Sequence, residues 1–263
     1  MSNQLKFRVL FILATLVAGV FIFITKPFQL GLDLQGGIRV VLEAQETGSI
    51  KADQDSISGA MEVIRSRIDG LGVSEPIIRR KGTKQIVVEL PGIKNPDRAM
   101  SLIGETALLE FVEGEWAPDD ISNLPPDKLE LLIGPNATIS KYVEKDAQGK
   151  VTRERSIILR NKSIAGTFLK SANPGTSQYG DPVVNIEFND EGTTLFRDMT
   201  GRCVGKPIAI MLDKTIISAP NVNEPISGGK AQISGHFSVQ EMRDLVIKLK
   251  AGALPIPVKI VSH

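Results

Sequence analysis

Residues 31–44 read GLDLQGGIRVVLEA, and this stretch determines how the first part of the chain folds. Its two adjacent glycines allow positive φ angles and a close approach of the backbone to a neighbour. The aspartate before them can accept backbone N–H groups and fix a turn. A phosphate-binding loop is excluded, because no strand precedes the glycines and no helix follows them. The stretch therefore leads into a first strand at 38–44, and its characteristic residues are Gly31, Asp33, Gln35, Gly36 and Gly37.

An uncharged apolar segment, VLFILATLVAGVFIFIT at residues 9–25, precedes this stretch, with Lys6 and Arg8 before it and Lys26 after it. As a helix it would be about 25 Å long, close to the ~30 Å apolar core of a bilayer. A cleaved signal peptide is the alternative, but the segment is long for a signal and no A-x-A-like site follows it. We therefore predict an uncleaved transmembrane helix, with the amino terminus in the cytoplasm and the rest of the chain outside.

After the first strand, apolar side chains recur first at helical spacing and then in short β-rich runs. Asn95, followed by proline, is a good amino-terminal helix cap. The predicted elements are a helix at 53–71, a strand at 84–90, a helix from Asn95 to about 103, and a strand at 107–113. This β-α-β-α-β order is typical of a small layer in which helices cover one face of a sheet.

Prolines and charges make residues 114–165 irregular, and residues 166–181 are rich in Gly, Pro, Ser and Asn, which predicts a loop. Regular patterns return afterwards, and Ser238 with Glu241 forms a capping box. The predicted elements are strands near 138–144, 155–160, 183–188, 208–212, 215–219, 231–234 and 257–261, and helices at 190–202 and from 238 to about 250.

These patterns predict an α+β fold: a ferredoxin-like base domain with an inserted α+β head, preceded by one transmembrane helix. The boundaries that we expect are 1–27 for the cytoplasmic tip and membrane helix, 28–113 and 236–263 for the two parts of the base, and 114–235 for the head. Two halves in tandem remain an alternative.

Composition excludes several classes of function. The net charge is +1 and aromatic residues make up 5% of the chain, which disfavours nucleic-acid binding. Cys203 is the only cysteine, and His236 and His263 are the only histidines, so neither a disulfide nor a zinc site is expected. No nucleophile and base are paired in the sequence. We therefore predict no enzymatic activity, no cofactor and no metal.

Four blocks of sequence resemble the SecD family of protein-export subunits. They are GLDLQGGIRVVLEA at 31–44, the block at 64–111 that begins IRSRIDGLGV, the block at 208–238 that begins IAIMLDKTII, and LKAGALPIPVKIV at 249–261. Together they cover most of the chain, and residues 114–165 are the least family-like portion.

The resemblance implies a subunit in the bacterial inner membrane that associates with SecF and the SecYEG translocon. In that family the proton-motive force drives late translocation, and a periplasmic domain with a base and a mobile head engages unfolded preprotein. SecD-like chains continue into further membrane helices that carry the proton-relay carboxylate, so proton coupling is assigned to no residue of this chain.

For the head, we predict a swing about the junctions near 114 and 235 and capture of preprotein by an adaptable apolar surface. Composition singles out the strand at 215–219 and the loop after it, and the candidate contact residues are Ile216, Ile217, Ala219, Pro220 and Val222. The two isoleucines could equally well lie on opposite faces of a buried strand.

Two rival functions are the exported domain of a related small-molecule efflux pump and an anchored extracytoplasmic enzyme. A different membrane half and transport of a small solute would identify the pump. Activity retained by the soluble part alone would identify the enzyme.

Overall fold

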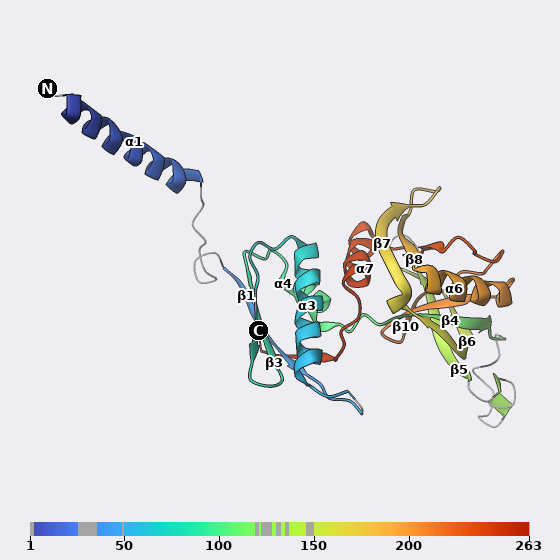
Figure 1. Cartoon of the computed structure of the whole chain (residues 1–263). Coiled ribbons are helices and arrows are strands. Elements are labelled where there is room, and N and C mark those ends of the chain that lie inside the picture. Colours follow the sequence, from blue (N-terminus) through green and yellow to red (C-terminus); the bar gives the residue numbers. More distant parts are fainter. Residues whose placement is uncertain are drawn as a thin grey trace.

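Figure 1 shows a helix at the amino terminus followed by two folded units. The computed structural model describes residues 3–25, 36–48, 50–118, 121, 128–129, 133–134, 137–145 and 150–262. The α+β prediction is confirmed at the coarser level, since both units combine helices and strands. We call the unit nearer the amino terminus the base and the other unit the head.

Helix α1 (Asn3–Thr25) contains the predicted apolar segment. Its described large apolar side chains are exposed, with Phe7, Leu10 and Phe21 each about two-thirds accessible or more. Over the part of the chain that the structure describes, no helix reaches the length and hydropathy of a membrane span.

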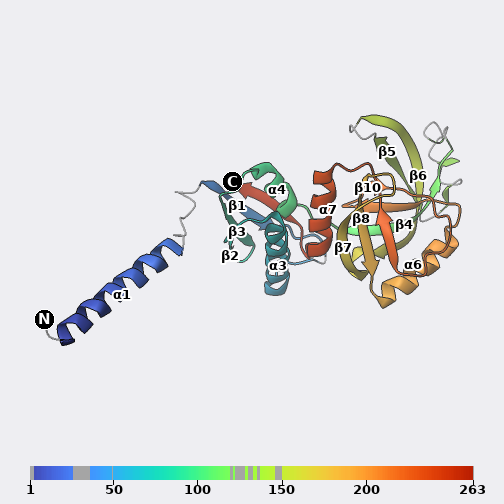
Figure 2. The ribbon, with the colours of Figure 1, turned by 90° about the horizontal axis from the view of Figure 1, so that it is seen from above.

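The base is a four-stranded antiparallel sheet with two helices against it (Figure 2). Along the chain its elements are β1 (Gly37–Ala44), α3 (Gln54–Leu71), β2 (Ile77–Lys81), β3 (Gln85–Pro91), α4 (Pro96–Gly104) and β12 (Val258–Ser262). The spatial order of the strands is β12-β1-β3-β2. The sheet is therefore completed by a strand from the far end of the sequence, which ties the two ends of the folded region together.

Local sequence explains the helices of the base. The side chain of Asp53 accepts a hydrogen bond from the backbone N–H of Ser56 at the start of α3, and Gly72 ends the helix at φ 74°. Between these caps, Ile57, Ile64 and Ile68 are fully buried in the core of the base together with residues of β1 and β3. The cap Asn95 at the start of α4 is confirmed, since its side chain accepts from the N–H of Arg98.

The head contains two sheets. The five-stranded sheet has the order β10-β9-β4-β6-β5 and the three-stranded sheet has the order β11-β8-β7. The strands are β4 (Leu109–Trp116), β5 (Ala137–Lys145), β6 (Val151–Ala165), β7 (Leu169–Thr176), β8 (Pro182–Phe188), β9 (Ile208–Leu212), β10 (Thr215–Ser218) and β11 (Lys230–Ile233). The helices are a 3-10 turn (Gly166–Phe168), α6 (Asp190–Arg202) and α7 (Val239–Ala251). Phe111, Phe188 and Phe196 meet in the core that joins these elements.

The structure corrects the placement of two elements that we expected in the base. The strand predicted at 107–113 is β4, and it pairs with β6 and β9 in the head sheet. Helix α7 buries Met242, Leu245, Val246 and Leu249 in the head core. The expected boundaries at 113/114 and 235/236 therefore do not coincide with the change of sheet or core, because the chain enters the head before Leu109 and leaves it after α7.

Two further predictions are corrected. We expected residues 166–181 to form a loop, but they contain β7. This strand pairs with β8 through main-chain groups, although its own sequence includes Asn, Pro and Gly. Strand β2 was missed, because its charged sequence, IIRRK, resembles an exposed turn. It is the edge strand of the base sheet, where charged side chains are common.

Candidate functional site

The turn before β1 is described from Gly36 onwards. Gly36 has φ 67° and Gly37 has φ 136°, both in the region that favours glycine. The carbonyl of Gly36 accepts a hydrogen bond from the N–H of Gly92 at 2.9 Å, which ties this turn to the end of β3. Gly31, Asp33 and Gln35 lie outside the described residues.

The candidate contact residues of the head divide into two groups. Ile216 and Ile217 pack on opposite sides of β10: Ile216 contacts a small cluster that includes Met211, whereas Ile217 contacts the main head core. Ala219 and Val222 are buried, and Pro220 alone is exposed. The two isoleucines therefore lie on opposite faces of a strand, which was one of the two arrangements that the sequence allowed.

The loop at 219–229 connects β10 of the larger sheet to β11 of the smaller sheet. Its first part is fixed by main-chain bonds: the N–H of Ile208 donates to the carbonyl of Pro220 at 3.0 Å, and the N–H of Val222 donates to the carbonyl of Lys206 at 2.9 Å. The hydroxyl of Ser218 donates to the carbonyl of Ser234, so the two sheets are joined at this point.

Two cavities flank this loop. The larger has a volume of about 710 Å³, and its wall includes Tyr142, Tyr179, Pro220 and His236. The smaller has a volume of about 290 Å³, and its wall includes Phe111, Phe196, Ile226 and Ala231. Pro220 and Gln232 line both cavities. A mixed polar cavity and an apolar cavity therefore lie on either side of the same short piece of chain.

A cluster of aromatic side chains lies beside the larger cavity. The indole N–H of Trp116 donates to the side-chain oxygen of Asn221 at 2.9 Å, and the ring of Trp116 contacts Tyr142. The guanidinium of Arg155 lies 3.7 Å from the centre of the Trp116 ring, a cation–π contact. Burial raises the pKa of Tyr142. We did not predict this cluster, because Trp116 and Tyr142 fall in the region whose sequence is irregular.

The described residues provide little for catalysis or metal binding. Within these ranges no group of three or more His, Cys, Asp or Glu side chains could hold a metal ion. Cys203 is buried, and burial raises the pKa of its thiol, which disfavours the reactive thiolate. What the head offers to a ligand is the surface and the hydrogen-bonding groups of its two cavities.

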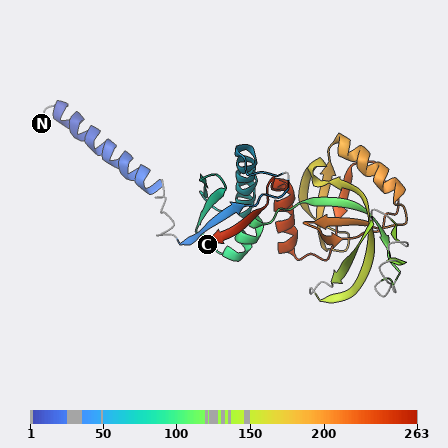
Figure 3. The same ribbon diagram turned by 90° about the horizontal axis from the view of Figure 1, so that it is seen from below.

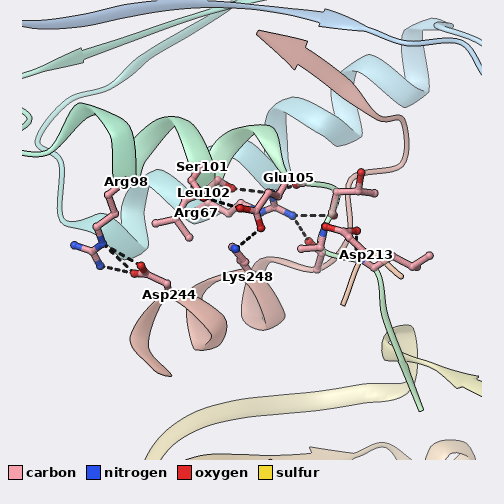
Figure 4. A network of polar contacts seen from close by, with 12 residues as sticks. Arg67, Arg98, Ser101, Leu102, Glu105, Asp213, Asp244 and Lys248 are labelled. Carbon is pink, nitrogen blue, oxygen red and sulfur yellow. Dashed lines mark hydrogen bonds and ion pairs between the residues drawn. The ribbon is translucent and has the colours of Figure 1, made fainter. Parts of the chain in front are cut away.

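A second feature is the junction between base and head, shown in Figure 4. Arg67 of α3 is fully buried, and its guanidinium donates to the backbone carbonyls of Leu102, Glu105, Thr106 and Gly252. Burial lowers the pKa of Arg67 to about 10, while the carboxylates of Asp213 and Glu105 act to raise it. Arg67 therefore remains a buried cation at neutral pH and holds the two segments that cross from base to head.

Asp213, in the turn between β9 and β10, fixes the outgoing segment from the side of the head. Its carboxylate accepts hydrogen bonds from the N–H groups of Ala107 at 2.8 Å and Leu108 at 2.9 Å. Ala107 has a positive φ of 58°, unusual for a residue other than glycine, and this carboxylate helps to hold it.

Helix α7 carries two ion pairs to the base (Figure 4). Arg98 of α4 contacts Asp244 of α7 at 2.6 Å, and Lys248 of α7 contacts Glu105, just after α4. Burial acts to raise the pKa of Glu105, but hydrogen bonds from Lys248 and Ser101 bring it below its ordinary value. These four side chains link a helix of the head to the base.

Comparison with known proteins gives a consistent result. Residues 140–256 match the family model of the SecDF P1 head subdomain, residues 57–115 match the amino-terminal part of the SecDF P1 domain, and residues 21–47 match the SecD/SecF GG motif. The head match extends through α7, in agreement with the packing of that helix.

Among curated relatives, the protein translocase subunit SecD of Dictyoglomus turgidum is 38% identical over the whole chain, which covers 55% of that relative. The SecD subunit of Acidaminococcus fermentans is 36% identical, again over the whole chain and 52% of the relative. The chain thus spans about half the length of the curated relatives it matches.

Two solved structures resemble this fold. A crystal structure of SecDF in a super-membrane-facing form is 32% identical with a TM-score of 0.67, and the match covers 99% of this chain and 35% of the other. A structure described with SecDF as a membrane component that enhances protein export is 31% identical with a TM-score of 0.64, and the match covers 86% of this chain and 99% of the other. The chain therefore belongs to the SecD family of protein translocase subunits.

Proposed function

We propose that this chain assists protein export by holding unfolded preprotein on the outer side of the bacterial inner membrane, together with SecF and the SecYEG translocon. The observation that carries this proposal is the pair of cavities on either side of the loop at 219–229. In this view the head binds a segment that has emerged, moves relative to the base, and limits backward sliding while the proton-motive force drives the cycle.

The binding surface that we propose suits many sequences. An extended polypeptide presents regular main-chain groups and varied side chains, so a general receptor needs main-chain partners and pockets of tolerant shape. Strand β11 is an edge strand, and Ala231 to Ile233 of this strand line the apolar cavity. A segment that lies along this edge could place an apolar side chain in the smaller cavity and polar ones in the larger.

In this proposal, four of the five predicted contact positions support the binding surface instead of being exposed to the preprotein. Ile216 and Ile217 pack in the clusters on either side of β10, next to the loop, and Ala219 and Val222 line the cavity walls. Pro220 is the member of the set that is exposed to a ligand, and it lies where the two cavities meet.

We also propose that α1 anchors the chain in membrane lipid, with the amino terminus in the cytoplasm. The support is the helix itself, which exposes Phe11, Leu13, Leu16 and Val17 among the described residues. A helix that is apolar on all sides is stable in lipid and unfavourable in water.

The base is proposed to be a ferredoxin-like domain. Its connection order, β1-α3-β2-β3-α4-β12, is the βαββαβ pattern of that fold, with the head inserted between the last helix and the last strand. The insertion leaves two chain crossings between the domains, and this is the connection that a mobile head requires.

Site-specific photocrosslinking in membranes tests preprotein binding. A photoreactive residue at Asn223, which is exposed and lines the apolar cavity, should crosslink to a stalled secretory chain while export proceeds. The matched control is a probe at Thr194, exposed on α6 and outside both cavities. Equal crosslinking at both positions, or none at Asn223 during active export, would contradict the proposal.

A further inference from the structure

We propose that the junction between head and base is a pivot with a separate latch, and this rests on the head movement in the proposed function. The pivot is Arg67 with the carbonyl groups that it binds, and it stays closed. The latch is the contact of α7 with α3 and α4, including the pairs Arg98–Asp244 and Lys248–Glu105, and it opens when the head moves.

The pivot has the properties of a permanent contact. Arg67 is fully buried and binds carbonyl groups from both crossing segments, near Glu105 on the way out and at Gly252 on the way back. The N–H of Leu254 also donates to the carbonyl of Thr106 at 2.9 Å, so the two segments are bonded to each other. Separating these groups would leave a buried cation and several carbonyls without partners, which is strongly unfavourable.

The crossing segments nevertheless contain residues suited to a hinge. Ala107 and Gly252 have φ angles of 58° and 80°. Hinges are usually a few residues at the ends of elements that absorb a change in backbone angles. Rotation about these residues, with the bond from Ala107 to Asp213 released, can turn the head while the carbonyls bound to Arg67 stay in place.

The latch has the properties of a reversible contact. Arg98 and Asp244 keep 29% and 22% of their side-chain surface in solvent, and Glu105 keeps 41%. Lys248 is more buried, at 12%, so these pairs are partly exposed and can exchange their contacts for water when the helices separate. The apolar side of α7, including Leu245 and Leu249, faces the head core, so α7 would travel with the head. Domain interfaces that include such partly exposed polar pairs permit relative motion.

Close helix packing completes the latch. A Cβ atom placed on Gly70 of α3 would lie 2.9 Å from Cγ1 of Ile247 on α7, closer than such atoms approach. Figure 3 shows α7 between the base and the sheets of the head. Gly70 therefore lets the two helices meet, and any larger side chain there would push the latch open.

The test is a distance measurement between base and head in the full chain in lipid vesicles. Spin labels are attached at Ser66→Cys on α3 and Thr194→Cys on α6, both exposed, and double electron–electron resonance gives the distribution. The buried Cys203 is left in place. We expect two components, a closed one and an open one.

Two kinds of variant address the latch. Removing both ion pairs with Arg98→Gln and Lys248→Gln should raise the ratio of open to closed form about 3- to 10-fold, given the usual strength of exposed pairs. Gly70→Ala should raise the same ratio by steric means. The controls are Arg79→Gln, which breaks a 2.6 Å pair with Glu89 inside the base, and Gly201→Ala on α6, where a Cβ has nothing within 4 Å.

The outcomes distinguish failure of the latch from failure of the head movement on which it rests. Two components whose ratio responds to the latch variants, and not to the controls, would support the latch. Two components whose ratio is unchanged by them would overturn the latch while leaving head movement intact. A single component in every variant would overturn both, since the head would then be fixed to the base.

Discussion

At the scale of single residues, Arg67 determines how base and head are connected. It is one of the largest fully buried side chains, and it lies on a helix whose other buried residues are apolar or small. A buried guanidinium is tolerated here because four backbone carbonyls accept hydrogen bonds from its two terminal nitrogens, while its Nε has no acceptor among the described residues. The surrounding sequence, IRSRIDG, does not predict which arginine is buried, since it also contains Arg65, which is exposed.

Substitution of Arg67 should therefore be costly. We expect Arg67→Met to lower the free energy of unfolding by about 2–4 kcal/mol, because several buried carbonyls lose their donor. Urea denaturation followed by circular dichroism measures this. The matched control is Arg65→Met on the exposed side of the same helix, for which we expect a change within about 0.5 kcal/mol. Equal effects would show that the carbonyl bonds of Arg67 contribute nothing.

Glu105 should make stability depend on pH in the acidic range. Its pKa in the folded state lies below the ordinary value of 4.5, so the carboxylate stabilises the fold at pH values above 4.5. This contribution is lost as the pH falls through the lower folded pKa. The difference in unfolding free energy between wild type and Glu105→Gln should be constant above about pH 5.5 and shrink in more acidic solution. A difference that grows on acidification would contradict the assignment.

At the scale of elements, helix ends were predictable because their signals are local. Helix α6 runs from Asp190 to Arg202, as predicted, and the capping box of Ser238 and Glu241 forms at the start of α7. Strand partners were less predictable, because pairing depends on residues far away in the chain. The sequence at 107–113 indicates a strand, but nothing in it says that β6 and β9 are its neighbours.

The candidate site was predicted only in part for the same reason. The strand and loop that begin at Thr215 were identified by composition, and the loop indeed borders both cavities. The opposite wall of the larger cavity comes from Tyr142 and Tyr179, which no local pattern connects to that loop. Their meeting depends on the closure of two sheets, and a single sequence does not specify that closure.

The capping box gives a prediction for α7. Ser238→Ala should lower the free energy of unfolding by about 1 kcal/mol, because the N–H of Glu241 loses its acceptor. Thermal unfolding measures the change, and Ser58→Ala on the exposed surface of α3 is the control. An equal effect of both substitutions would indicate that the box does not stabilise α7.

At the scale of the whole molecule, the order of elements explains how one chain builds two domains. The base is interrupted after α4 and resumes with Leu254 and Ile256, which are buried in its core. Everything between belongs to the head, including α7. The head is therefore attached by two short segments that lie side by side and are bonded to each other between Leu254 and Thr106.

We propose that the cavities beside the 219–229 loop bind unfolded polypeptide, and Trp116 allows this binding to be measured directly. It is the only tryptophan of the chain and its indole is bonded to Asn221 of that loop. The fluorescence of the full chain in lipid vesicles is recorded during titration with a tryptophan-free, unfolded secretory peptide. The variant Ala231→Leu, which fills part of the apolar cavity, is compared with Ala231→Ser, which leaves it open.

We predict a saturable change in Trp116 fluorescence for wild type and for Ala231→Ser, with affinity at least tenfold weaker for Ala231→Leu, a loss of about 1.4 kcal/mol or more. No change in fluorescence with any peptide, or equal affinity for the two variants, would contradict binding in these cavities.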